Sequence, residues 1–307
     1  MTTIECDNYE SRVSITPLLK KRVDPVIYGN AAGPLDEVKV KSFEENGFLF
    51  FDSFLSGKEL DEAIAAQKKL KIQQTDDPKT IFELENKEKK VRSIFNIHES
   101  NAVFKEISHN PRIVQMVEQL LDSQVYIHQS RINYKPAFRG KEFYWHSDFE
   151  TWHIEDGMPR MRAISCSISL TENTSFNGAL MVIPGSHKVF ISCVGETPKD
   201  HFKESLKKQE YGVPDDKNLA DLAEKHGIAS PLGGPGSLLL FDCNLMHGSN
   251  SNISPTSRTN VFYVYNRNRS KYNVKKLKIK AQKALAFMEY FGLENKTAIV
   301  HFAPTLF

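Results

Sequence analysis

The chain has 307 residues, of which 40% are hydrophobic and 25% charged, and its net charge of +2 is that of an ordinary globular protein. This near-neutral charge favours neither nucleic acid nor a membrane surface as a partner. The N-terminus lacks the basic and apolar regions of a signal peptide, and no apolar run reaches the roughly 18 residues needed to span a membrane. We therefore expect a cytoplasmic protein that binds neither nucleic acid nor membrane.

The four cysteines, Cys6, Cys166, Cys193 and Cys243, show neither the spacing of a metal site nor that of a disulfide framework. Thiols of cytoplasmic proteins are normally kept reduced. These cysteines are therefore expected to be unpaired and structural.

The first part of the chain is predicted to be an irregular arm followed by helices. Residues 1–35 contain scattered proline and glycine, which are typical of irregular structure. Helical patterns follow, and a strand is predicted over 47–51, between the first and the second helix. The charged stretch 74–90 is expected to be loop and exposed helix. The helices are predicted over 39–46, over 56–73 after a capping box, and over 101–122 with a division at Pro111.

Beyond residue 124 the pattern changes to short alternating or apolar runs bounded by turn residues, which is typical of strands. These strands are predicted over 125–134, 162–170, 178–187 (ending in a Pro-Gly turn), 237–241 and 259–265. Antiparallel strands with helices outside and no βαβ rhythm favour a mainly β fold with flanking helices, a double-stranded β-helix (jelly-roll, cupin-like) core. We expect one domain over 1–307, made up of this core with the arm 1–35, an insertion 189–228 containing a helix over 216–226, and a basic tail 267–307.

The tail has many lysines and arginines and no acidic residue before Glu289. A solvated basic helix over 274–291 is the favoured interpretation, with a nucleic-acid-binding arm and a changed reading frame as alternatives.

A His-x-Asp pair, His146 and Asp148, is the first candidate for metal binding. In an extended segment, residues two apart point to the same face, so an imidazole and a carboxylate reach one metal ion. His247 is the candidate third ligand of a facial triad, the site of non-haem Fe(II) oxygenases. His153 would lie on the opposite face of a continuous strand and is excluded, and His187 at its turn is assigned to hydrogen bonding.

Arg258 lies at the start of the strand that follows His247. Enzymes that use iron and 2-oxoglutarate need a guanidinium deep in the pocket for the far carboxylate of the keto acid. Arg258 is the candidate, and an arginine on the surface after a Ser/Pro-rich loop is the alternative.

With these residues in place, the chain resembles the phytanoyl-CoA dioxygenase-like superfamily of Fe(II)/2-oxoglutarate oxygenases over about residues 8–266. Within that superfamily, the run from Trp145 to Pro159 (WHSDFETWHIEDGMP) resembles the signature of ectoine hydroxylases. The tail after Asn266 departs from those enzymes, so a substrate contact from the tail is not expected.

The resemblance implies Fe(II) as cofactor and 2-oxoglutarate and O2 as co-substrates. It implies hydroxylation of ectoine to 5-hydroxyectoine, a compatible solute made under osmotic stress, with release of succinate and CO2. The alternatives are a hydroxylase of another small substrate and a non-catalytic barrel that binds metal or 2-oxoglutarate. The assembly is predicted to be a homodimer.

Two further groups of residues are assigned on this basis. The helpers of Arg258 in binding 2-oxoglutarate are expected to be Asn133, Ser249, Ser251 and Phe143. Ectoine carries a carboxylate and a delocalised amidinium, which need hydrogen-bond donors and an aromatic face. The expected contacts are Gln129, Thr151, Trp152, Ser167 and Phe262. The alternatives are core packing for the aromatic residues, and solvent rather than a pocket for the polar rows containing Gln129, Asn133 and Ser167.

Overall fold

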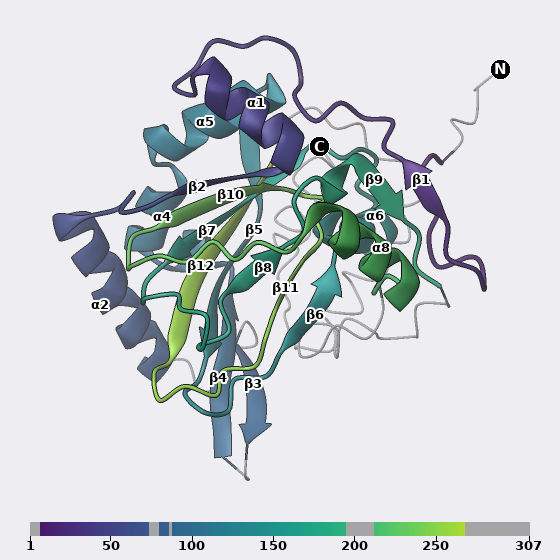
Figure 1. The fold of residues 1–307 in the computed structure, drawn as a ribbon. Coiled ribbons are helices and arrows are strands. Elements are labelled where there is room, and N and C mark those ends of the chain that lie inside the picture. The colour runs from purple at the N-terminus through teal and green to yellow at the C-terminus, as the bar shows by residue number, and fades with distance from the viewer. Residues whose placement is uncertain (1–6, 74–79, 86–87, 195–211, 268–307) are drawn as a thin grey trace, which may run out of the picture.

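The computed structural model describes residues 7–73, 80–85, 88–194 and 212–267, and two sheets of antiparallel strands form its centre (Figure 1). The large sheet runs, in order, β2 (Phe48–Phe51), β10 (Leu238–Asp242), β7 (Ala163–Ser169), β12 (Arg258–Arg267), β5 (Val125–Lys135), β4 (Glu88–Phe95) and β3 (Thr80–Glu85). The small sheet runs β6 (Phe143–His146), β11 (His247–Ser249) and β8 (Leu180–Val182). This arrangement confirms the predicted jelly-roll core.

Helices cover the outer face of the large sheet (Figure 1). These are α1 (Glu37–Asn46), α2 (Gly57–Gln73), α4 (Ala102–Ser108) and α5 (Pro111–Leu121), with the short α3 (Ile97–Ser100) before α4. The largest hydrophobic cluster lies between them and the sheet, and the predicted apolar face of α5, with Ile113, Val117 and Leu120, is fully buried in it. The helices thus cover the outer face of the large sheet, and its inner face turns toward the small sheet.

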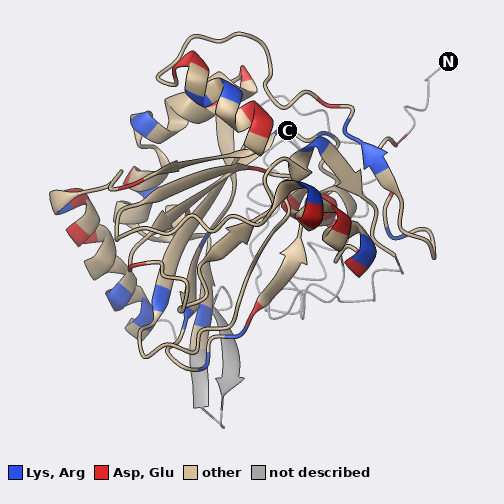
Figure 2. Ribbon diagram, in the orientation of Figure 1, with Lys and Arg blue, Asp and Glu red and all other residues tan. Residues whose placement is uncertain are grey.

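Charged residues lie mainly on the helices and on the N-terminal strand, whereas the central strands of the large sheet carry few of them (Figure 2). The helix α8 (Asp216–His226) begins where it was predicted, because Asp215 caps it by accepting from the Asn218 amide. A two-stranded sheet joins β1 (Leu19–Lys21), in the predicted arm, to β9 (Val189–Ile191), in the predicted insertion, and the short helix η1 (Ser186–Lys188) precedes β9.

The structure corrects two sequence-based interpretations. The stretch 74–90 was expected to be loop and helix, but its described part forms β3 and the start of β4, an antiparallel pair at the edge of the large sheet. Charged residues are common on edge strands because they prevent pairing with other chains, so charge did not indicate a helix here. The segment after β6 is not extended either: it turns at Ser147 into α6 (Asp148–Asp156).

The predicted tail helix over 274–291 lies outside the described residues. Within the described part of the chain, no helix is both long and apolar enough to cross a membrane. Three cysteines, Cys166, Cys193 and Cys243, are buried and unpaired, and burial raises the pKa of each thiol.

Candidate active site

Three side chains converge between the two sheets. His146, the last residue of β6, pairs with His247, the first residue of β11, and their ring centroids are 4.2 Å apart. Asp148, at the start of α6, places Oδ1 3.8 Å from His146 Nε2 and 3.9 Å from His247 Nε2. One ligand atom from each residue lies within 4.8 Å of the others, which is the arrangement of a metal site.

Hydrogen bonds orient all three groups toward one point. The Nδ1 of His146 donates to the Tyr144 carbonyl at 2.7 Å and that of His247 to the Leu245 carbonyl at 2.9 Å, so both Nε2 lone pairs are left for a metal. Ser165 Oγ donates to Asp148 Oδ2, which leaves Oδ1 facing the imidazoles. Burial, and next the neighbouring His247, lowers the pKa of His146 to about 3, so this ring is neutral. Two imidazoles and one carboxylate fit Fe(II).

The position of His247 depends on the turn between β10 and β11. The side-chain Nδ2 of Asn244 donates to the carbonyls of His187 and Val189, and Ser186 Oγ accepts from the backbone amide of Met246. The predicted Pro-Gly turn before His187 therefore holds the third ligand in place without supplying a ligand itself.

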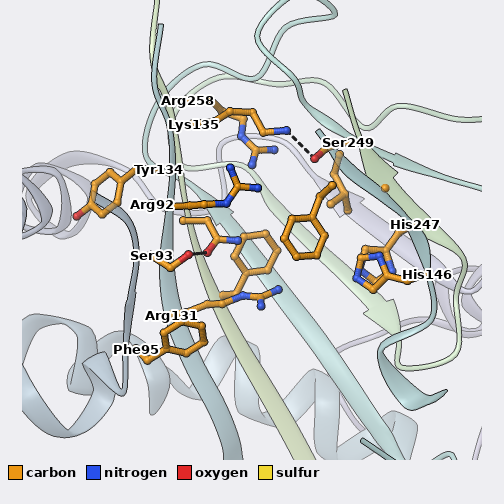
Figure 3. Close-up of a pocket in the computed structure, with 15 residues that line it drawn as sticks. Arg92, Ser93, Phe95, Arg131, Tyr134, Lys135, His146, His247, Ser249 and Arg258 are labelled. Atoms are coloured by element: carbon orange, nitrogen blue, oxygen red, sulfur yellow. Dashed lines mark hydrogen bonds between the residues drawn. The ribbon is translucent and has the colours of Figure 1, made fainter. Parts of the chain in front are cut away.

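A cavity extends from the two imidazoles to a cationic end formed by β4, β5 and β12 (Figure 3). Arg258 and Lys135 lie at the end far from His146 and His247, and Arg92 and Arg131 line the side. The residues lining the cavity are Arg92, Ser93, Phe95, Arg131, Asn133, Tyr134, Lys135, Phe143, His146, Leu180, His247, Gly248, Ser249, Arg258 and Phe262.

Arg258 is buried, with 3% of its surface exposed, and its Nε and Nη1 have no hydrogen-bond partner. Burial, and next the neighbouring Arg92, lowers its pKa to about 10, so the guanidinium is still charged at neutral pH. A buried charge is costly unless it is paired, so these open donors are suited to an anion. Nearby, Lys135 Nζ donates to Ser249 Oγ at 2.7 Å and adds a second positive charge.

Strand register aligns the inner face of the large sheet in rows. On β5, β12 and β7, opposite residues share one face, and the rows are Asn133–Asn260–Ser169, Arg131–Phe262–Ser167 and Gln129–Val264–Ser165. The last row includes Ser165, whose Oγ donates to Asp148. The predicted polar rows therefore face the interior and not solvent.

Comparison with known proteins agrees with this geometry. A family model described as phytanoyl-CoA dioxygenase (PhyH) matches residues 43–260. The chain is 51% identical over 266 residues to an ectoine dioxygenase of Bordetella bronchiseptica, covering 85% of each chain. The chain belongs to the ectoine dioxygenases of the PhyH family.

Other family members are similar over almost the same length. An ectoine dioxygenase of Halomonas elongata is 48% identical, covering 85% of this chain and 80% of its own. The crystal structure of EctD from S. alaskensis with 2-oxoglutarate and 5-hydroxyectoine superposes with a TM-score of 0.78 at 41% identity, covering 87% of this chain and 89% of that one. The epimerase SnoN, at 13% identity and a TM-score of 0.60, shares the fold alone.

In this ectoine dioxygenase family member, the residues expected around 2-oxoglutarate are mostly together. Asn133, Ser249 and Phe143 line the cavity with Arg258. Ser251 does not line it, and its Oγ donates to Glu142 instead.

Of the residues expected to contact substrate, some lie in or beside the cavity and others do not line it. Phe262 lines the cavity, and Ser167 lies beside it in the same row, where its Oγ accepts from Asn260. Gln129, Thr151 and Trp152 do not line this cavity. Trp152 is 6% exposed, packs in a hydrophobic cluster and contacts the His128 ring.

Three cations that line the cavity had no predicted role: Arg92, Arg131 and Lys135. The alternation of β5 placed Arg131 on the polar face, and this was the signal that could have identified it. Arg131 Nε is buried without a partner, and its guanidinium lies 5.2 Å from the centre of the Phe262 ring.

The two excluded histidines are indeed outside the metal group. His153 lies on α6 and not on the opposite face of a continuous strand, so the predicted reason for its exclusion was wrong. It is kept from the site by hydrogen bonds to Asp7 and to the Met158 carbonyl. His187 Nε2 donates to the Glu44 carbonyl.

Proposed function

We propose that this protein is an Fe(II)- and 2-oxoglutarate-dependent oxygenase that hydroxylates ectoine to 5-hydroxyectoine, consuming O2 and releasing succinate and CO2. The observation that carries the proposal is a cavity lined by both histidines of the His-Asp-His group and by a buried guanidinium that has open donors. The family relationship supplies the substrate.

His146, Asp148 and His247 would hold the iron, which supplies activation of O2 when bound. The protein's part is to present two imidazoles and one carboxylate, already oriented by hydrogen bonds. Arg258 would bind the far carboxylate of 2-oxoglutarate through two parallel hydrogen bonds, with Asn133, Ser249 and the charge of Lys135 beside it.

The substrate would occupy the part of the inner face that continues past Phe262. Gln129 and Ser167 point into the interior from the two rows nearest Asp148. Thr151 carries a buried Oγ1 without a partner, on the helix that begins with Asp148. Arg131, with its open Nε, is suited to the carboxylate of ectoine, and Trp152 and Phe262 offer aromatic faces to the amidinium.

The test is incubation of the purified protein with ectoine, Fe(II), 2-oxoglutarate and O2, followed by the product mass. We expect ectoine to gain one oxygen atom, with one succinate formed per product. Succinate without a hydroxylated product would favour another small substrate. No succinate, in a protein that binds both iron and 2-oxoglutarate, would favour a non-catalytic barrel.

We further propose that the reaction takes place in the cytoplasm, in a homodimer, and that residues 1–307 act as one catalytic domain. The three buried free thiols are consistent with a reducing compartment. Light scattering on the purified full chain tests the dimer.

A further inference from the structure

The arm before α1 lies outside the residues matched by the family model, which begins at residue 43. Part of this arm nevertheless contacts α6, the helix whose first residue is Asp148. The contact joins residues 138 positions apart in the chain.

Arg12 makes this contact through three nitrogen atoms. Its Nε and Nη2 donate to the two carboxylate oxygens of Glu150, at 3.0 and 2.7 Å, and its Nη1 donates to Glu155 at 2.7 Å. Ser11 Oγ also donates to Glu150, at 2.6 Å. One guanidinium therefore holds α6 at two points along its length.

The pair between Arg12 and Glu150 is enclosed. Their side chains are 2% and 1% exposed, and a Cβ added to Gly212 would lie 2.5 Å from both. Arg12 has a φ of 59°, a conformation that non-glycine residues adopt only when surrounding contacts impose it. Its amide donates to the Cys193 carbonyl, and Ser11 Oγ accepts from the Cys193 amide, so the arm is fixed where it meets the helix.

A buried ion pair adds little to stability, because desolvation of the two charges offsets their attraction. What it does impose is geometry. The helix α6 has nine residues, too few to be stable alone, so its orientation depends on contacts with the rest of the chain. On the barrel side, the Phe149 amide donates to the Cys243 carbonyl and Ser147 Oγ donates to Asn244.

We propose that Arg12 is a positioning residue that, through Glu150 and Glu155, sets the orientation of α6 and thereby the place of Asp148 at the metal and of Thr151 and Trp152 beside the substrate. Only the part of this inference that concerns Thr151 and Trp152 rests on the proposed function, because metal binding through Asp148 is measured without ectoine.

The test compares four proteins. Arg12→Met alone would leave Glu150 buried without a partner, so the main variant combines Arg12→Met with Glu150→Gln, which removes both charges and keeps an acceptor for Ser11. Arg12→Lys keeps the charge but not the bidentate geometry. The matched control is Gln119→Leu, because Gln119 fastens the same N-terminal segment at Leu35, through bonds to its amide and carbonyl, without touching α6.

Two quantities are measured well below the melting temperature of each protein: the Kd for Co(II), a spectroscopic substitute for Fe(II), and the ratio of succinate to hydroxyectoine. In the double variant we expect the Kd to rise on the order of tenfold, as for other groups that orient a metal ligand, and the ratio to rise above one. Arg12→Lys should show smaller changes of the same sign, and Gln119→Leu should match the parent in both.

The proposal would be overturned if the double variant kept the parental Kd for Co(II) and the parental ratio, even with a lower melting temperature. If the double variant does not fold, the same criterion applies to Arg12→Lys. If the parent itself makes no hydroxyectoine, the proposed function fails, and the Co(II) Kd still decides the role of Arg12.

Discussion

Replacing Arg258 by alanine tests the cationic end of the cavity most directly. In the free protein, its buried Nε and Nη1 have no acceptor, so the guanidinium has donors available for a carboxylate. A hydrogen bond to a charged group contributes about 1.5–3 kcal/mol. Two such bonds give about 3–6 kcal/mol, and we take the lower end because Lys135 and water compensate in part. A loss of about 3 kcal/mol corresponds to an increase of about 150-fold in the Michaelis constant for 2-oxoglutarate.

The assay measures succinate formation while 2-oxoglutarate and ectoine are varied in turn, in the parent, Arg258→Ala and Arg258→Lys. The lysine variant keeps a charge but loses the planar pair of donors, so its constant should rise about tenfold. The constant for ectoine should change less than about threefold in both variants, because the triad and the inner rows are untouched. Equal increases in the two constants would refute the assignment of Arg258 to the keto acid.

Three other changes test the remaining parts of the fold and site. Asp148→Ala should leave two imidazoles that hold Fe(II) weakly, and stoichiometric iron in the purified variant, by metal analysis, would contradict the triad. Trp152→Ala should cost about 3–5 kcal/mol of stability because the ring is buried. It should also lower the succinate formed in the presence of ectoine more than the succinate formed without it. Stimulation by ectoine at the parental level would remove Trp152 from the substrate site. Burial lowers the pKa of His187 to about 4, so between about pH 4 and 6.5 the unfolded state binds one proton that the folded state does not, and stability falls as the pH falls. His187→Gln should reduce the slope of urea-unfolding free energy against pH in that window by up to about 1.4 kcal/mol per unit, and an unchanged slope would contradict the burial argument.

The sequence predicted the elements whose signals are local. The helix α8 carries its own cap, and α5 begins at a proline, so both were placed closely. The edge pair β3 and β4 was missed, because its place depends on pairing with a distant strand and not on its own charged residues. The start of α6 had a local signal, Ser147 in the N-cap position of a Ser-x-x-Glu sequence, and its Oγ accepts from the Glu150 amide. The His-x-Asp pattern was nevertheless interpreted as extended.

The same distinction holds for the site. The spacing of His146 and Asp148 is local, and both lie in the group of candidate metal ligands. The cationic lining could be predicted only in part: the alternation of β5 placed Arg131 on the polar face, but its position beside Phe262 depends on pairing across the sheet. Arg12 gave no signal at all, since its partner is 138 positions away.

The buried cysteines have a consequence for a protein that handles iron and oxygen. The thiolate, and not the thiol, reacts with peroxide, and burial keeps Cys166, Cys193 and Cys243 in the protonated form. Two neighbouring carboxylates, first Asp242 and to a smaller extent the candidate ligand Asp148, raise the pKa of Cys243 further. In a protein whose reaction consumes O2, these three thiols are therefore poor sites for oxidation to a sulfenic acid or a disulfide.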